Sequence, residues 1–403
     1  MRLVHKTKIS KTDKGYAKLV ELSKTANNLY NQANYIIRQN FIFNVTNDGN
    51  RKYLNYNAMD KLAKKHEWEN YLNLPAQSAQ QLLRQLDKNW KSFFAAIKDW
   101  KMNPDKYLSR PKPPKYCKKG GLHQVIFTAQ QAKIKGSKIH FPKVLNGLTL
   151  EWNKTGKVCE IRMLPMGNHF VAEIVYKVVE AVLKPDNNRY ASIDLGLNNL
   201  AAVSFSDGST PIIINGKPLK SINNYYNKKI ADAKSELEKT QNKKKSNYID
   251  TLWKKRGNIM RDKMHKASRK IVNYLVSRNI NTLVVGHNKL QKQGTTFQGL
   301  EDFVQVPIFE LIKLLKYKCA LVGITVIETE EQYTSGTSFL DNEQPTEPNY
   351  NKSRRRKRGL FVSNEKIAIN ADVNSAYQIL NKVYNVEYNS SKLIFMPKKI
   401  NLQ

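Results

Sequence analysis

The stretch from Arg189 to Ser204 constrains the fold more than any other part of the sequence. It predicts a buried strand, a Gly turn at Asp194-Leu-Gly196 and a second strand, which together form a β-hairpin. Further strands are predicted at 282–285 and 324–327, and helices at 218–280, 305–320 and 369–380. This order of elements predicts a mixed α/β sheet with helical crossovers between parallel strands.

The N-terminal part of the chain has a different pattern. Residues 1–10 predict a short strand, and apolar residues at helical spacing predict helices over 16–43 and after Pro75. The Pro-rich, basic stretch 107–120 predicts a linker or a domain crossing. Short alternating segments between 124 and 180 predict a small β-barrel or meander. We expect the first strand to join this β-unit, so the helices would form an insertion in it.

The charge of the chain indicates a polyanionic partner. The sequence has 68 Lys and Arg against 33 Asp and Glu, a net charge of +35, and such an excess repels itself unless a polyanion neutralises it. The 20 Tyr and 5 Trp are scattered among the basic residues, which suits base stacking. No apolar run reaches the roughly 18 residues of a membrane span. Nucleic acid is therefore a better partner than a membrane surface.

The number and spacing of the cysteines indicate the cellular compartment and exclude some kinds of metal site. Cys117, Cys159 and Cys319 are far apart in the sequence, which excludes a disulfide framework and a local zinc site made of four cysteines. We therefore expect a reducing, intracellular compartment.

Two aspartates stand where a metal-dependent hydrolase needs carboxylates. Phosphodiester hydrolysis of this type uses two divalent cations about 4 Å apart, held mainly by carboxylates. In RNase H-type sheets, strands one, four and five are parallel neighbours, so their C-terminal ends share one edge. Asp194 ends the first predicted strand and Asp372 opens the last helix. The alternatives are a turn residue for Asp194 and a helix N-cap for Asp372.

The third carboxylate is less obvious. The strand at 282–285 is followed by Gly286, where an acid is expected. The next strand ends in Ile327-Glu-Thr-Glu-Glu331, so we favour Glu331 as the third ligand, with Glu330 next. The alternative is a solvated acidic strand end. His287 is another candidate ligand, although a single His after a strand is more often structural.

Basic and aromatic residues give candidates for nucleic-acid contact, against the alternative of an ordinary solvated surface. In the N-terminal helices we expect Arg38, Arg84, Lys88 and Lys91 to contact the backbone, with Tyr30 and Trp90 as stacking residues. In the second half the candidates are Arg256, Arg261, His265, Lys266, Arg269, Arg354, Arg355 and Arg356. The last three belong to the basic run 352–358, which predicts either a clamp on nucleic acid or a disordered loop.

At these residues the sequence resembles the TnpB (OrfB) family of transposon-encoded proteins, relatives of the type V CRISPR effector nucleases. The matching segments are IDLGLNNLAAVS at 193–204, RGNIMRDKMHKASRKIV at 256–272, YTS at 333–335 and ADVNSAYQIL at 371–380. The segments 29–41 and 86–94 are similar to the N-terminal half of the family. The resemblance covers nearly the whole chain, and the motifs in order are more specific than any one alone.

The resemblance implies an α/β fold with a β-barrel and a helical lobe. Its parts are a wedge β-barrel (1–10 and 108–185), an inserted helical recognition lobe (11–107), a split RNase H-like (RuvC-type) nuclease domain (186–335 and 359–385), a basic insertion (336–358) and a C-terminal tail (386–403). It also implies a guide RNA, and cleavage of DNA beside a short motif with Mg²⁺ or Mn²⁺.

The family's catalytic residues map onto this sequence with two departures. Asp194 matches the family's first catalytic Asp and Asp372 its last, whereas Gly286 stands at the position of the middle Glu. A branch of the family has its Glu on the next strand, which would make Glu331 a catalytic metal ligand with the two Asp. No CxxC pair follows the YTS segment, so we expect no zinc.

The resulting expectation is an RNA-guided DNA endonuclease that acts as a monomer with its RNA in the prokaryotic cytoplasm, associating with the nucleoid during action. The alternative, motivated by Gly286, is a nuclease-inactive RNA-guided DNA-binding protein that acts as a transcriptional repressor. A DNA transposase is disfavoured because the sequence has no Tyr or His-hydrophobe-His nicking motif. A structural RNA-binding protein would explain the charge but not three acids at one sheet edge.

Overall fold

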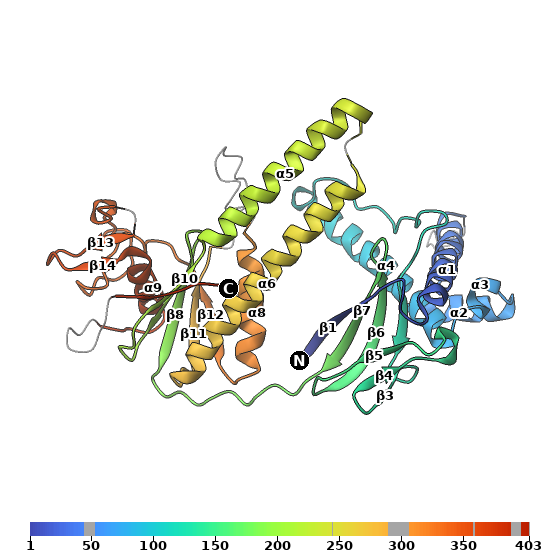
Figure 1. Cartoon of the computed structure of the whole chain (residues 1–403), viewed down its shortest axis with the longest axis horizontal. Coiled ribbons are helices and arrows are strands. Elements are labelled where there is room, and N and C mark those ends of the chain that lie inside the picture. The colour runs from blue at the N-terminus through green and yellow to red at the C-terminus, as the bar shows by residue number, and fades with distance from the viewer. Residues whose placement is uncertain (44–52, 244, 289–305, 358, 388–395, 403) are drawn as a thin grey trace. The chain divides into compact units, whose positions relative to one another are not determined.

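The structure, a computed structural model, describes residues 1–43, 53–243, 245–288, 306–357, 359–387 and 396–402 (Figure 1). The chain divides into two compact units, Met1–Val179 and Glu180–Gln403. The predicted domain boundary at 185 lies slightly later. Residues just before it belong to the second unit, because the N–H of Lys184 donates to the carbonyl of Gly323 (2.9 Å). Within the described ranges, no helix is both long enough and apolar enough to cross a membrane.

The first unit contains two antiparallel sheets, one with the strand order β1-β7-β6-β2 and one with the order β3-β4-β5. The strands are β1 (Arg2–Ile9), β2 (Val125–Thr128), β3 (Lys133–Lys135), β4 (Lys138–His140), β5 (Thr149–Glu151), β6 (Lys157–Pro165) and β7 (Phe170–Lys177). Strand β1 pairs with β7 from Arg2 opposite Lys177 to Ile9 opposite Phe170. The prediction that the N-terminal strand joins the later β-unit is therefore confirmed.

The helices between β1 and β2 pack on these sheets. They are α1 (Tyr16–Phe43), α2 (Tyr56–Lys65), α3 (Glu69–Leu72) and α4 (Ala76–Met102), and α1 and α4 match the two predicted helices. Leu19 and Leu29 of α1, Leu86 of α4 and Phe127 and Ile161 of the sheets are buried in one hydrophobic core. Sheets and helices therefore form one compact unit, although the sequence predicted separate barrel and helical domains.

The Pro-rich stretch 107–120 lies along α1. A row of asparagines on that helix binds its backbone: Asn27 Nδ2 donates to the carbonyl of Lys118 (3.0 Å), and Asn31 both donates to and accepts from Cys117 (3.0 and 2.8 Å). Asn34 Nδ2 donates to the carbonyl of Pro114 (3.1 Å). The predicted linker is thus tied to α1 by hydrogen bonds between side chains and backbone.

The second unit is built on a six-stranded sheet with the order β12-β11-β8-β9-β10-β15. Its strands are β8 (Tyr190–Leu195), β9 (Asn199–Phe205), β10 (Ile212–Asn215), β11 (Thr282–Gly286), β12 (Thr325–Thr329) and β15 (Lys398–Ile400). Strands β8 and β9 form the predicted antiparallel hairpin, and β8, β11 and β12 are parallel neighbours as expected. Strand β15 was not predicted: it pairs with β10 within the segment expected to be a C-terminal tail.

Helices cover both faces of this sheet (Figure 1). They are α5 (Lys217–Gln241), α6 (Asn247–Ser277), α8 (Ile308–Ala320) and α9 (Ala371–Asn381). Ala191 and Ile193 of β8 are buried in one core with α6 and α8. On the opposite face, Ser192 Oγ donates to the carbonyl of Ala376 and Ser204 Oγ to that of Val373 (3.3 Å), which ties α9 to the sheet. The alternation along β8 therefore separates the two helical layers.

The predicted single helical stretch 218–280 is two helices, because Asn242 adopts a left-handed conformation (φ 47°) between α5 and α6. Short 3-10 turns lie at Pro104–Lys106, Lys143–Leu145 and Lys352–Arg354.

Contacts with α9 give the basic insertion its shape. Asn374 accepts from the N–H of Phe339 (3.0 Å) and donates to the carbonyl of Thr337 (2.8 Å). The ring of Phe339 stacks on Tyr377 with centroids 4.4 Å apart. The insertion is followed by a small hairpin of β13 (Leu360–Val362) and β14 (Ala368–Asn370). Of the two predictions for the basic run, a disordered loop does not fit the described part, 352–357; Arg358 lies outside the described residues.

A buried lysine makes the stability of the second unit depend on pH. Lys318 of α8 is 3% exposed and donates to the carbonyl of His265 (2.8 Å) and to Ser268 Oγ (2.6 Å) of α6. Burial, together with the charge of Arg269, lowers the pKa of Lys318 to about 8. Because the unfolded chain binds this proton more tightly, its contribution to the unfolding free energy rises as the pH increases from about 8 to 10.5.

We expect Lys318→Met to raise the unfolding free energy by about 1 kcal/mol at pH 7, since an apolar side chain of similar length needs no buried charge. The variant should also lose the part of the pH dependence between 8 and 10.5. Denaturant unfolding at several pH values tests this, with Lys313→Met as an exposed control on the same helix. A difference curve between wild type and Lys318→Met that is flat with pH would contradict the assignment.

Candidate active site

Asp194 lies near the end of β8, opposite Ala202 of β9. Its side chain points to the α9 face of the sheet, because Ile193 next to it is buried on the other face. Burial, together with the carboxylates of Asp372 and Glu331, raises the pKa of Asp194 to about 8, while the charge of Arg355 opposes this rise. The residue is therefore part of a strand and one of three neighbouring acids, and is not a turn residue.

Asp372 lies in the first turn of α9, but it does not cap the helix. The N-cap is Asn370, whose side chain accepts from the N–H groups of Asp372 (3.0 Å) and Val373 (3.2 Å). The carboxylate of Asp372 instead accepts from Asn199 Nδ2 (2.6 Å) and from Arg355 Nη2 (3.1 Å). The N-cap alternative for Asp372 is thus answered by Asn370.

The two glutamates after β12 differ in their surroundings. Glu331 is half-buried, and its carboxylate contributes to the raised pKa of Asp194. Glu330 is exposed and does not contribute to that shift. Both glutamates interact with Lys382, at the C-cap of α9. Burial lowers the pKa of this lysine, and the charges of the two glutamates oppose the shift only in part. Of the two candidates, Glu331 is the one whose charge acts on Asp194.

The packing of α9 against β11 accounts for a glycine at position 286. It follows Val285, which is level with Ile193 of β8, and it is itself level with Thr329 of β12. A Cβ atom at position 286 would lie 2.3 Å from Cδ1 of Ile379 of α9, so the helix fills the space that an acidic side chain on β11 would need. His287 is buried with its ring edge-on to Phe309, at a centroid distance of 5.0 Å, which fits the structural role considered for it.

Asp194 and Asp372 line a pocket of about 480 Å³, together with Asn199, Arg355 and Lys357. Acidic groups and basic groups therefore meet around one cavity, a combination that suits a cation and a phosphate. Carboxylates are the donors that Mg²⁺ and Mn²⁺ prefer, and three of them interact here, so the donor set fits such an ion. Among the described residues, however, no three His, Cys, Asp or Glu side chains are grouped closely enough to hold an ion as they stand.

Asn199 and Lys357 are site residues that the sequence analysis did not single out. Asn199 belongs to the IDLGLNN segment and holds one carboxylate oxygen of Asp372. The motif contained the signal, but only the structure shows which of its two asparagines is used. Lys357 stands in the basic run, where no local pattern separates it from its neighbours.

The prediction that Tyr30 and Trp90 stack on bases is wrong. Tyr30 is 5% exposed, and its ring stacks on His123 at 4.9 Å inside the first unit. Trp90 is 1% exposed, and its Nε1 donates to Asn34 Oδ1 (3.0 Å). Both aromatic rings are packed in the core, so neither is accessible to a base.

The basic candidates of the first unit lie at its surface or bind its own backbone. Arg84, Lys88 and Lys91 of α4 are exposed; Lys91 pairs with Asp87 (2.7 Å), and the guanidinium of Arg84 lies 4.2 Å from the ring centroid of Tyr56. Arg38 donates to the carbonyl of Pro114 and lies over the ring of Tyr116, so it fixes the Pro-rich stretch.

In the second unit, four candidates on α6 are exposed: Arg261, His265, Lys266 and Arg269. Arg256 is half-buried and donates to Asn223 Oδ1 of α5 (2.9 Å). Among the arginines of the basic run, Arg354 is also half-buried.

Arg354 pairs with Glu343 through Nη1, and its assignment to nucleic-acid contact stays a prediction. Arg355 is exposed but holds Asp372, and Arg356 is exposed.

The sequence matches two protein families and is similar to a viral protein. Residues 173–291 match the family OrfB_IS605, described as a probable transposase, and residues 309–379 match the Cas12f1-like TNB domain. A TnpB-like protein, ORF457 of Acidianus two-tailed virus, is 25% identical over 417 residues, which cover 93% of this chain and 85% of that protein.

Solved structures of similar chains have low sequence identity. A mini-RNA-guided endonuclease, CRISPR-Cas_phi3, is 10% identical with a TM-score of 0.48, covering 94% of this chain and 92% of that one. The Cas12f1 chain of a complex with sgRNA and target DNA is 15% identical with a TM-score of 0.38, covering 94% of this chain and 99% of that one. The two family matches and the viral relative all make this chain similar to TnpB (OrfB) proteins.

Proposed function

We propose that the chain is an RNA-guided DNA endonuclease that hydrolyses target DNA beside a short flanking motif. Its metal ligands in this proposal are Asp194, Glu331 and Asp372. The observation that carries the proposal is the raised pKa of Asp194, to about 8, with Asp372 and Glu331 among its causes. A buried acid whose charged form is destabilised by two neighbouring carboxylates is costly to a fold unless a bound cation offsets the repulsion.

The topology of the second unit supports this assignment. We infer an RNase H-like, RuvC-type sheet, in which β8, β9, β10, β11 and β12 correspond to strands one to five. The parallel neighbours β8, β11 and β12 then end at one edge, where open α/β sheets place their ligands. Asp194 and Glu331 lie at or just after the ends of two of these strands.

The residues of the pocket have distinct roles in the proposed reaction. Asn199 orients the carboxylate of Asp372 through its hydrogen bond to Oδ2, and Lys357 offers a positive charge to the phosphate. Arg355 neutralises Asp372 and must leave its Oδ1 atom before that oxygen binds an ion. A bound Mg²⁺ or Mn²⁺ would supply Lewis-acid stabilisation of the charge that develops on the phosphate.

The charge of the chain supports nucleic-acid partners. A net charge of +35 and the exposed cations of α6 suit the backbones of a guide RNA and a target DNA. In this proposal the first unit provides the wedge and recognition functions that the resemblance implies. The chain then acts as a monomer with its RNA, in the prokaryotic cytoplasm.

The alternative of a nuclease-inactive repressor rests on Gly286 alone. The close approach of Ile379 accounts for that glycine, and Glu331 on the neighbouring strand supplies a third carboxylate near Asp194. The alternative is therefore not favoured.

Plasmid cleavage by the chain with its co-purified RNA tests the three ligands. We expect Asp194→Ala, Glu331→Ala and Asp372→Ala each to reduce Mg²⁺-dependent cleavage by about a hundredfold or more, because each removes a cation ligand. Glu330→Ala, one position away from Glu331, should cut at nearly the wild-type rate. Wild-type cutting that survives EDTA, or full activity of Asp194→Ala, would remove this site from consideration.

The stability of the metal-free chain provides a test independent of cleavage. The pKa of Asp194 is raised from 3.8 to about 8 in the folded state, so the folded state binds the proton more tightly. The unfolding free energy should therefore fall as the pH rises from about 4 to about 8.

We expect Asp194→Asn to be more stable than the wild type at pH 8 in EDTA, with a difference that shrinks toward pH 4. Mg²⁺ should raise the Tm of the wild type at pH 8 but not that of Asp194→Asn, because ligand binding stabilises the folded state only where the site is intact. Thermal unfolding with and without Mg²⁺ measures both. Equal responses of the two proteins to Mg²⁺ would argue against a metal site at Asp194.

A further inference from the structure

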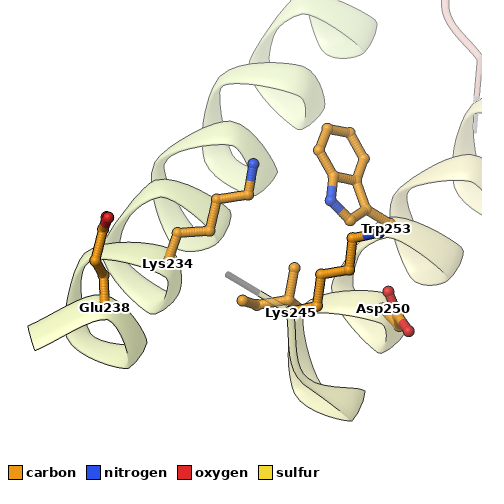
Figure 2. A pocket seen from close by; sticks show the side chains of 6 residues that line it. Lys234, Glu238, Lys245, Asp250 and Trp253 are labelled. Atoms are coloured by element: carbon orange, nitrogen blue, oxygen red, sulfur yellow. The ribbon is translucent and has the colours of Figure 1, made fainter. Parts of the chain in front are cut away.

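The α5–α6 hairpin carries a second pocket, away from the carboxylates. The pocket has a volume of about 570 Å³ and lies between the C-terminal half of α5 and the beginning of α6 (Figure 2). Its lining residues are Lys234, Glu238, Lys245, Ile249, Asp250 and Trp253. This volume is in the range of sites that bind small ligands.

An exposed tryptophan forms one wall of the pocket. The side chain of Trp253 is 41% exposed, whereas Ile249 on the same helix is 3% exposed and packs with Ile230 of α5 in the small core of the hairpin. Lys234 reaches toward Trp253 from α5, with its Nζ 5.9 Å from the ring centroid (Figure 2). The guanidinium of Arg256 also lies near the ring, 5.4 Å from its centroid, so Trp253 has two neighbouring cations and still leaves 41% of its side chain open to solvent.

The rest of the hairpin has the composition of a nucleic-acid surface. Residues 217–277 contain seventeen Lys and Arg and only five Asp and Glu. Tyr225 and Tyr248 are 53% and 59% exposed, and Lys229 lies 4.7 Å from the ring centroid of Tyr225. Exposed aromatic rings among cations are the surface on which unpaired bases stack while their phosphates are neutralised.

The position of the pocket distinguishes it from the catalytic site. Lys234 is seventeen residues along α5 from Lys217, where the helix begins next to β10, which corresponds to about 25 Å at 1.5 Å per residue. The strand being cut lies at the carboxylates, so this pocket serves a part of the nucleic acid that is held at a distance. Among the groups of a nucleic acid, an unpaired base has the exposed flat face that can stack on Trp253, and such bases occur in the loops and bulges of a folded RNA.

We propose that this pocket binds one unpaired nucleobase of the guide RNA, stacked on Trp253, with Lys234 and Lys245 at the adjacent phosphates. The proposal deepens the proposed function and rests on it for the identity of the RNA. Glu238 and Asp250 line the same pocket and, as carboxylates, only accept hydrogen bonds. Guanine, which presents two adjacent N–H donors on its pairing edge, is the base that best matches them.

The test is the affinity of the full chain for the RNA that co-purifies with it, measured by filter binding without metal or DNA at several salt concentrations. Trp253→Ala should weaken binding about tenfold with an unchanged salt slope, because it removes one stacked base and no charge. Trp253→Phe should retain most of the affinity. Lys234→Ala should weaken binding and reduce the salt slope by about one.

Tyr248→Ala is the matched control, since Tyr248 is an exposed aromatic residue of the same helix that does not line the pocket. Thermal unfolding of each variant verifies that the hairpin remains folded. Equal RNA affinities for Trp253→Ala and Tyr248→Ala would overturn the proposal. So would an unchanged RNA affinity combined with weaker capture of single-stranded target DNA by the RNA-loaded Trp253→Ala chain, which would place DNA in the pocket.

A second experiment, with short RNAs, tests the preference of the pocket for guanine. An eight-nucleotide uridine RNA with one central guanine should quench tryptophan fluorescence more than the all-uridine RNA, and Trp253→Phe should lose that difference. Failure of the wild type to bind any RNA would instead contradict the proposed function, whereas loss of cleavage alone leaves the pocket intact. The two proposals therefore fail in distinguishable ways.

Discussion

The attachment of α9 to the sheet is the interaction on which the second unit depends. Two buried serines, Ser192 and Ser204, donate to carbonyls of the helix, and this brings its first turn to the end of β8. Buried hydroxyls are costly unless they are paired, so these hydrogen bonds fix the position of the helix as well as holding it. This contact places Asp372 near Asp194, although 177 residues lie between them in the chain, and the charge of Asp372 therefore acts on Asp194.

The same packing decides where the third acid can be. The side chain of Ile379 of α9 occupies the space above Gly286, so it would have to shift to admit a side chain on β11 at this position. An acid after β12 meets no such obstruction, and Glu331 is half-buried with its charge acting on Asp194. Helix α9 also shapes the insertion through Asn374 and Tyr377, which bind and stack on residues 337–339. One helix thus organises both the carboxylates and the segment that carries Arg355.

Much of this architecture could be predicted from sequence, because its strongest signals are local. The hairpin at 189–204, the strands at 282–285 and 324–327 and the long helices follow from apolar periodicity, and Asp194 and Asp372 follow from their positions at element ends. Contacts between distant segments were not predictable. Trp90 shows why: its helix has a basic face, but the indole turns to Asn34 of another helix and is buried. The strand at 398–400 was missed because three residues are too few to show alternation, and its pairing with β10 depends on the whole sheet.

The second unit combines a cationic surface with a pocket that contains acidic side chains. The chain is strongly cationic, yet Asp194 and Asp372 line one pocket, and two cations that line it with them, Arg355 and Lys357, come from the basic insertion. Arg355 offsets part of the repulsion by pairing with Asp372. In the proposed function, a divalent cation would compete with the guanidinium for the same carboxylate oxygen, and its binding would release a positive charge at the rim of the pocket. A phosphate that enters the pocket would accept that charge, so the proposal expects metal and substrate to bind cooperatively.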